Sequence, residues 1–132
     1  MEKPRLLIID SNPFSLAANR EAFRKAGLEV KTLASVTNAA YWWETFKPMI
    51  LVLSGETMRR EIDEFQEIQQ QGLPTVAMLL VVGYKRSEHL LHKGAFQNFE
   101  FLEKSLPPSL LVKKVRLYLK SRRRRRSEKA TA

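Results

Sequence analysis

The chain has 132 residues and no cysteine, which excludes disulfide frameworks and thiolate metal sites. Hydrophobic residues make up 44% of it, as in a globular domain, and no apolar run approaches the ~20 residues of a transmembrane helix. The formal net charge is +9, and more than half of this excess lies in the last twelve residues. We therefore predict a domain over residues 1–120 and a basic, disordered tail over 121–132.

The first apolar run, Leu6–Ile9, is continuous, as in a strand buried on both faces of a parallel sheet. Ser11-Asn12-Pro13 predicts a helix start, and Gly27 predicts its end. Residues 28–33 then alternate between apolar and polar side chains, which is typical of an edge strand. The run before Asp10 is too short for a secretory signal, so we expect a cytoplasmic protein.

In the middle of the chain, Ser35 or Thr37 can begin a second helix, which Pro48 would end. Residues 49–53 form another apolar run and predict the third strand. A third helix is predicted over residues 57–71, because Gly72 follows it.

The C-terminal part continues the alternation of strands and helices. Strands are predicted over 75–80 and 99–102, with a short helix over 87–93 between them. Pro107-Pro108-Ser109 then opens a last helix with one apolar and one basic face. Five strand–helix repeats predict an α/β fold, a doubly wound five-stranded parallel sheet with helices on both faces.

In such a sheet, functional residues lie beyond the carboxyl ends of the strands. Asp10, Ser54, Leu79 and Lys104 are expected there. Their order and spacing over residues 5–120 resemble the receiver domain of bacterial two-component response regulators. The resemblance implies a flavodoxin-like (βα)5 fold with strand order 2-1-3-4-5, and a role in signal transduction or a phosphorelay.

In an active receiver, a carboxylate that ends the third strand accepts a phosphoryl group, and two acids after the first strand help to hold Mg²⁺. Here Asp10 matches the first acid, but Ser11 replaces the second and Ser54 replaces the acceptor. Leu79 replaces the Thr or Ser that ends the fourth strand, whereas Lys104 is retained. The sequence therefore resembles a pseudo-receiver with a degenerate pocket.

A sixth position concerns the aromatic residue on the fifth strand that rotates when a receiver is phosphorylated. Phe101 matches this switch position but lacks a hydroxyl. The resemblance also implies an interaction face on the fourth helix, fifth strand and last helix. Its residues would be Tyr84, His89, Leu90, Lys113 and Arg116.

Several alternatives remain open at the pocket. Asp10 and Lys104 form either a residual functional pair or a structural ion pair. Glu56 either substitutes for the lost carboxylate or, as we expect, points into solvent from a loop. Ser54 is either a kinase target or a hydrogen-bonded residue at the strand end.

We expect no enzymatic activity, cofactor or metal site, because the chain has neither a glycine-rich phosphate loop nor a nucleophile–base pair. The favoured function is a phosphorylation-independent module that binds signalling proteins, including a second copy of itself. The alternative is a nucleic-acid-associated protein that binds phosphates through its arginine tail. That tail contains Arg122, Arg123, Arg124, Arg125 and Arg126.

Overall fold

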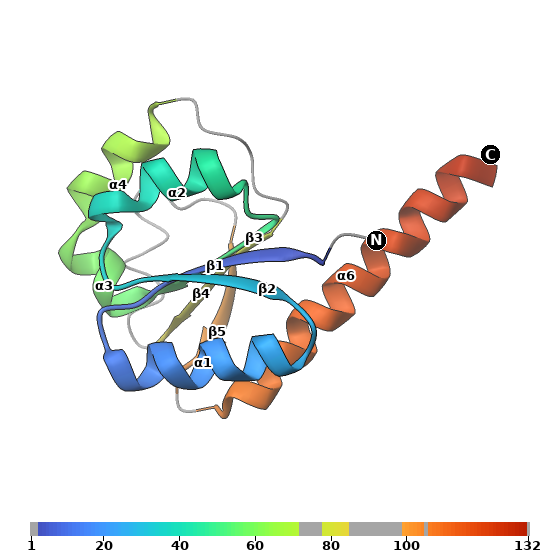
Figure 1. The fold of residues 1–132 in the computed structure, drawn as a ribbon, viewed down its shortest axis with the longest axis horizontal. Helices are drawn as coiled ribbons and strands as arrows, with labels where there is room; N and C mark the ends of the chain where they lie inside the picture. Colours follow the sequence, from blue (N-terminus) through green and yellow to red (C-terminus); the bar gives the residue numbers. More distant parts are fainter. Residues whose placement is uncertain (1–2, 72–77, 85–98, 105, 132) are drawn as a thin grey trace.

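A computed structural model of the chain describes residues 3–71, 78–84, 99–104 and 106–131. Its centre is a five-stranded parallel sheet with the order β2-β1-β3-β4-β5 (Figure 1). The strands are β1 (Arg5–Ile9), β2 (Glu29–Leu33), β3 (Ile50–Ser54), β4 (Met78–Gly83) and β5 (Glu100–Glu103). The predicted fold class and strand order are confirmed.

Helices cover both faces of the sheet (Figure 1). One face packs against α1 (Pro13–Lys25) and α6 (Pro108–Thr131), and the other against α2 (Ala39–Phe46), α3 (Gly55–Arg60) and α4 (Ile62–Gln69). Successive side chains of a strand point to opposite faces, so β1 contributes Leu6 to one core and Leu7 to the other. The segments Leu6–Ile9 of β1 and Ile50–Leu53 of β3 are apolar for this reason, because neither of their faces meets water.

The first helix begins and ends as its sequence predicts. The side chain of Asn12 accepts hydrogen bonds from the backbone N–H groups of Phe14 and Ser15, at 2.9 and 3.2 Å. Pro13 occupies the first helical position, where no N–H partner is needed. Gly27 follows the helix with φ +89°, a conformation that favours glycine.

The structure corrects the start of the second helix. Ser35 caps a short 3-10 helix, η1 (Val36–Asn38), and α2 begins only at Ala39. The carboxylate of Glu61 reinforces this start, because it accepts from Ser35 Oγ at 2.6 Å and from the N–H of Val36 at 3.1 Å. Of the two neighbouring tryptophans, Trp43 is buried, and Lys31 Nζ lies 3.7 Å from the ring centroid of Trp42.

The single third helix predicted over residues 57–71 is also wrong. The chain forms α3 directly after Ser54 and then α4, with Glu61 between the two helices. Sequence periodicity did not show the interruption, because the apolar residues on its two sides, Met58 and Phe65, both face the same core. Glu61 leaves helical geometry, with φ −114° and ψ 27°, and its side chain bonds to η1.

The fourth strand lies later in the sequence than predicted. β4 runs from Met78 to Gly83, and its pairing with β3 places Val82 opposite Ser54. The apolar run that follows Pro74 contains no residue that marks where a strand begins. Only its pairing with β3 therefore fixes the bounds and the register of β4. The predicted helix over 87–93 lies outside the described residues.

The last helix continues beyond the point where we expected a disordered tail. α6 extends from Pro108 to Thr131 and therefore includes the five arginines. Figure 1 shows its C-terminal half leaving the sheet and projecting away from the domain. Arginine is a good helix former, and extending an existing helix avoids the cost of nucleation. Within the described residues, no helix combines the length and apolar character needed to cross a bilayer.

Replacing Leu51 with alanine tests the central core. This side chain is fully buried in the middle strand, so we expect Leu51→Ala to lower the free energy of unfolding by about 2–5 kcal/mol. Urea denaturation followed by circular dichroism measures the loss. Leu117→Ala is the control, because that side chain is 58% exposed and should change stability by less than about 0.5 kcal/mol. Equal losses in the two variants would contradict the assigned core.

Candidate functional site

Parallel pairing brings three residues of the predicted pocket, Asp10, Ser54 and Lys104, to one edge of the sheet. Ile9 pairs with Leu53, so Asp10 and Ser54 follow in adjacent strands. Lys104 follows β5, and its N–H donates to the carbonyl of Gly83 at 2.8 Å. A cavity of about 320 Å³ opens at this edge, lined in part by Asp10, Ser54, Val82 and Lys104.

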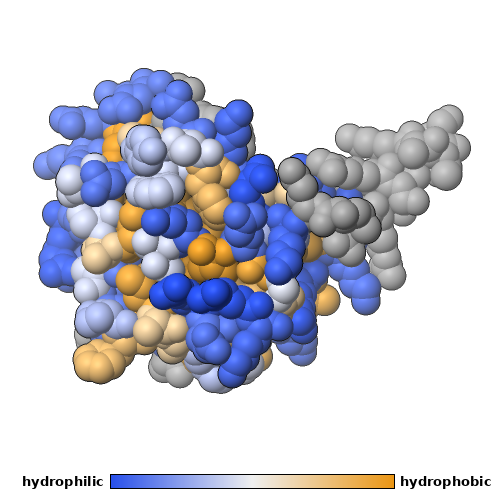
Figure 2. Space-filling model, viewed as in Figure 1, coloured by the Kyte–Doolittle hydropathy of each residue, from blue (hydrophilic) through white to orange (hydrophobic). Residues whose placement is uncertain are grey.

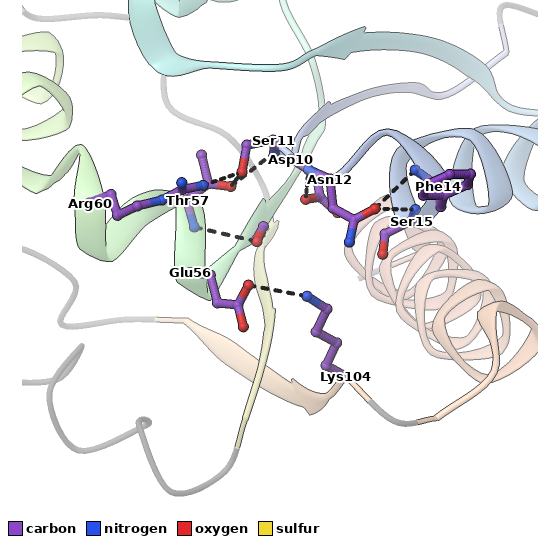
Figure 3. Close-up of polar contacts among 10 residues, drawn as sticks. Asp10, Ser11, Asn12, Phe14, Ser15, Glu56, Thr57, Arg60 and Lys104 are labelled. Carbon is purple, nitrogen blue, oxygen red and sulfur yellow. Dashed lines mark hydrogen bonds and ion pairs between the residues drawn. The ribbon is translucent and has the colours of Figure 1, made fainter.

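Asp10 is the buried carboxylate of this site, with only 6% of its surface exposed. Its Oδ1 accepts a hydrogen bond from the N–H of Asn12 at 2.9 Å (Figure 3). Burial raises the pKa of Asp10 above its ordinary value of 3.8, because desolvation penalises the charged form. The Asn12 hydrogen bond, the charge of Lys104 and a hydrogen bond with Ser54 oppose this rise, and Glu56 adds to it.

Ser11 takes part in a hydrogen-bond network that sequence reasoning missed. Its N–H donates to Thr57 Oγ1 at 3.0 Å, and the two hydroxyl oxygens lie 2.9 Å apart. The guanidinium of Arg60 also donates to Ser11 Oγ (Figure 3). Thr57 and Arg60 lie on α3, so the network connects the start of α1 to that helix. No local motif marks these two residues, since the contact spans more than forty positions in sequence.

Ser54 ends β3 and begins α3 at the same time. Its side chain is 6% exposed, and its hydroxyl oxygen is the N-cap acceptor for the N–H of Thr57, at 3.5 Å. This arrangement agrees with the interpretation of Ser54 as a hydrogen-bonded residue at the strand end. A serine that satisfies a helix N-terminus has a structural role that needs no phosphate.

Lys104 forms its ion pair with Glu56. The distance from Lys104 Nζ to Glu56 Oε2 is 3.3 Å, and these side chains are 20% and 46% exposed (Figure 3). Glu56 is exposed, as expected, but it lies in the first turn of α3 rather than in a loop, and its carboxylate pairs with Lys104. The suggested structural ion pair of Lys104 with Asp10 is also replaced by this contact. The Lys104 ammonium lies 5.5 Å from the ring centroid of Tyr84.

Leu79 does not belong to this edge of the sheet. It is the second residue of β4 and pairs with Leu51, three residues before the end of β3. The predicted strand end was misplaced, and Val82 occupies the position beside Ser54 instead. Val82 also lacks a hydroxyl, so the pocket still has no Thr or Ser at the end of β4.

The other predicted residues fall into three groups. Phe101 lies on β5 as predicted and packs against the core on the α2–α4 side. Tyr84, Lys113 and Arg116 are exposed, whereas His89 and Leu90 lie outside the described residues. The five arginines lie in the projecting half of α6, away from the pocket (Figure 1).

The pocket does not fit the Mg²⁺ ion that receivers use. Mg²⁺ requires oxygen ligands, usually carboxylates, in near-octahedral geometry. Asp10 is the one carboxylate at the expected position, Ser11 is bonded to Thr57 and Arg60, and Glu56 contacts Lys104. The described residues contain no cluster of three side chains suited to a metal. No step involving a metal follows from this arrangement.

Comparison with known proteins supports the fold alone. No protein-family model matches the sequence, and no curated protein does. The chemotaxis protein CheY4 of Vibrio cholerae superposes with a TM-score of 0.72 at 17% identity, covering 87% of this chain and 98% of that one. A receiver domain from Bermanella marisrubri gives 0.67 at 20% identity, with 87% and 97% covered. A CheY-like receiver from Methylobacillus flagellatus gives 0.67 at 16%, with 91% and 98% covered. The chain thus has the fold of response-regulator receiver domains.

The raised pKa of Asp10 predicts a pH-dependent stability. The folded state binds this proton more tightly than the unfolded state, so stability falls as pH rises from about 3.8 through the raised folded pKa. We expect Asp10→Asn to be more stable than the wild type at neutral pH and to lose this advantage below pH ~3.8. Urea denaturation across this pH range measures the difference. A variant less stable than the wild type at pH 7 would contradict the assignment.

Proposed function

We propose that this protein is a receiver-like signalling module that acts by protein–protein contact and is not phosphorylated on an aspartate of its own. The observation that carries the proposal is the position of Ser54. It occupies the end of β3, where an active receiver has its acceptor carboxylate, and it serves as the N-cap of α3.

The surrounding chemistry supports the same conclusion. A serine hydroxyl is a poor nucleophile unless an adjacent base activates it. A phosphate ester on Ser54 would also be stable, whereas receiver signalling depends on a labile acyl phosphate. The remaining acid, Asp10, is buried and bonded to the backbone of Asn12. We therefore propose a binding protein rather than an enzyme, with no resident cofactor.

Glu56 offers a reason why the module can work without phosphorylation. In active receivers, the lysine at the end of the fifth strand contacts the phosphoryl oxygens. Here Lys104 contacts the carboxylate of Glu56 at 3.3 Å, a permanent negative charge carried by the chain itself. Its ammonium also lies near the ring of Tyr84, which is 39% exposed. In this proposal, Lys104 connects the pocket to the exposed Tyr84 in one fixed arrangement, which needs no phosphoryl group.

A second function, binding to nucleic acid through the arginines, is favoured by one observation. α6 continues as a helix through Arg122–Arg126 and projects from the domain (Figure 1). An α-helix has 3.6 residues per turn, so the five consecutive arginines occupy more than one full turn of α6. This distribution suits non-specific attraction to phosphates better than recognition of a base sequence. Anisotropy with labelled DNA at two salt concentrations, compared with a chain ending at Lys120, tests it.

Treatment with a radiolabelled acyl phosphate and Mg²⁺ tests the main proposal. We expect no hydroxylamine-labile label on the wild-type protein, because the acceptor carboxylate is replaced by Ser54. An active receiver domain treated in parallel serves as the positive control. Labile label on this chain, lost in Asp10→Asn, would overturn phosphorylation independence.

Neutralising Glu56 tests the connection between the pocket and Tyr84. We expect Glu56→Gln to shift the backbone NMR signals of Lys104, Gly83 and Tyr84, while changing stability by less than about 1 kcal/mol because the ion pair is partly exposed. Glu100→Gln is the matched control, since Glu100 forms an exposed ion pair with Lys114 at 3.1 Å. Unchanged Tyr84 signals in Glu56→Gln would contradict the proposed connection.

A further inference from the structure

A groove remains between α1 and α6, on the opposite face of the sheet from α3. It encloses about 890 Å³ and is separate from the pocket of Asp10 and Ser54. Figure 2 shows mainly hydrophilic surface where α1 meets α6, with hydrophobic surface between the polar residues. The lining comes mainly from the C-terminal end of α1, the turn that follows it and the N-terminal half of α6.

The charged side chains of this groove all have the same sign. Lys25 comes from α1, and Lys113, Arg116 and Lys120 come from α6. No carboxylate is among the lining residues, although Glu21 forms an exposed ion pair with Lys25 at 3.6 Å. Like charges around one groove repel one another, so an occupant that carries carboxylates would be attracted.

The floor of the groove is apolar. Leu28 and Val112 are buried at its base, and Ala22 of α1 and Ala26, which directly follows α1, line it with short side chains. Leu117 is 58% exposed at its side. An apolar floor between basic side chains favours an amphipathic partner over a simple anion.

The length of the groove limits the size of its occupant. The lining residues of α6 extend from Ser109 to Lys120, which corresponds to about 16 Å at 1.5 Å per residue. A helix of about three turns would match that length. From the apolar floor, the basic sides and this length, we infer that the groove binds an acidic amphipathic helix of a partner protein.

Two other occupants fit less well. Nucleic acid would neutralise the basic residues, but its phosphate backbone gains nothing from an apolar floor. A second copy of the chain would bring a net charge of +9 against an already basic surface. The inference rests on the proposed function, because it names the partner class of a protein-contact module. The groove itself lies apart from Ser54, which occupies the phospho-acceptor position.

Binding of a designed peptide to the full chain tests the inference. The ligand is a fluorescein-labelled peptide of about 14 residues, with leucines at helical i, i+3, i+4 and i+7 spacing and glutamates elsewhere. We expect saturable binding by fluorescence anisotropy. A scrambled peptide of the same composition should bind at least about tenfold more weakly, because it has no continuous apolar face.

Three variants of the protein locate the site. Arg116→Glu and Lys120→Glu, combined, should weaken binding at least about tenfold through charge repulsion, and Leu117→Ala should weaken it through lost apolar contact. All three side chains are exposed, so the fold should be retained, as unchanged urea midpoints would verify. Arg59→Glu on α3, away from the groove, is the charge-reversal control for the single variants Arg116→Glu and Lys120→Glu, and should bind like the wild type.

Several results would overturn the inference. These are no peptide binding, equal binding of the scrambled peptide, or equal weakening by Arg59→Glu. Displacement of the peptide by duplex DNA at moderate salt, with no effect of Leu117→Ala, would favour nucleic acid instead. None of these binding measurements depends on phosphorylation of the protein. Labile acyl phosphate would overturn the proposed function without affecting the peptide result, and absent peptide binding would leave the phosphorylation result unchanged.

Discussion

The parallel pairing of β1 with β3 is the constraint on which the rest of the structure depends. It places Ile9 beside Leu53, and therefore brings Asp10 and Ser54 to the same edge of the sheet. Both strands are buried on two faces, so a shift in register would expose leucine and isoleucine side chains to water or misalign the two cores. The site is thus positioned by hydrophobic burial rather than by its own polar contacts.

Those polar contacts then determine what the site can do. In place of a set of converging carboxylates, the edge holds one buried acid, a serine that caps a helix, and a lysine paired with Glu56. Ser11 is bonded to Thr57 and Arg60, so a cationic group lies beside the position of the second acid. Each of these residues forms its hydrogen bond or ion pair with another residue of the same chain. These contacts are what supports the proposal of a fixed binding module rather than a phosphorylation switch.

The two surfaces proposed for partners lie in different parts of the domain. Around Tyr84, the pocket reaches the outside through Lys104 and Glu56. Between α1 and α6, a second surface combines apolar and basic residues and is continuous with a helix that carries five more arginines. In the proposed complex, the net charge of +9 would attract an acidic partner over a distance, and the apolar floor would supply contacts that charge alone does not.

The sequence by itself determined the fold class, the ends of α1 and the placement of Asp10, Ser54 and Lys104 at strand ends, because apolar periodicity and local capping act over a few residues. The strand order was expected only from the resemblance to receiver domains, and the pairing of the strands confirms it. Only the tertiary structure decided that Val82 rather than Leu79 lies beside Ser54, because β4 is an apolar run whose register depends on β3. Likewise, the direction of Glu56, the break at Glu61 and the Ser11–Thr57–Arg60 contacts depend on residues distant in sequence. Such contacts form only when the sheet brings their partners together, so no local pattern encodes them.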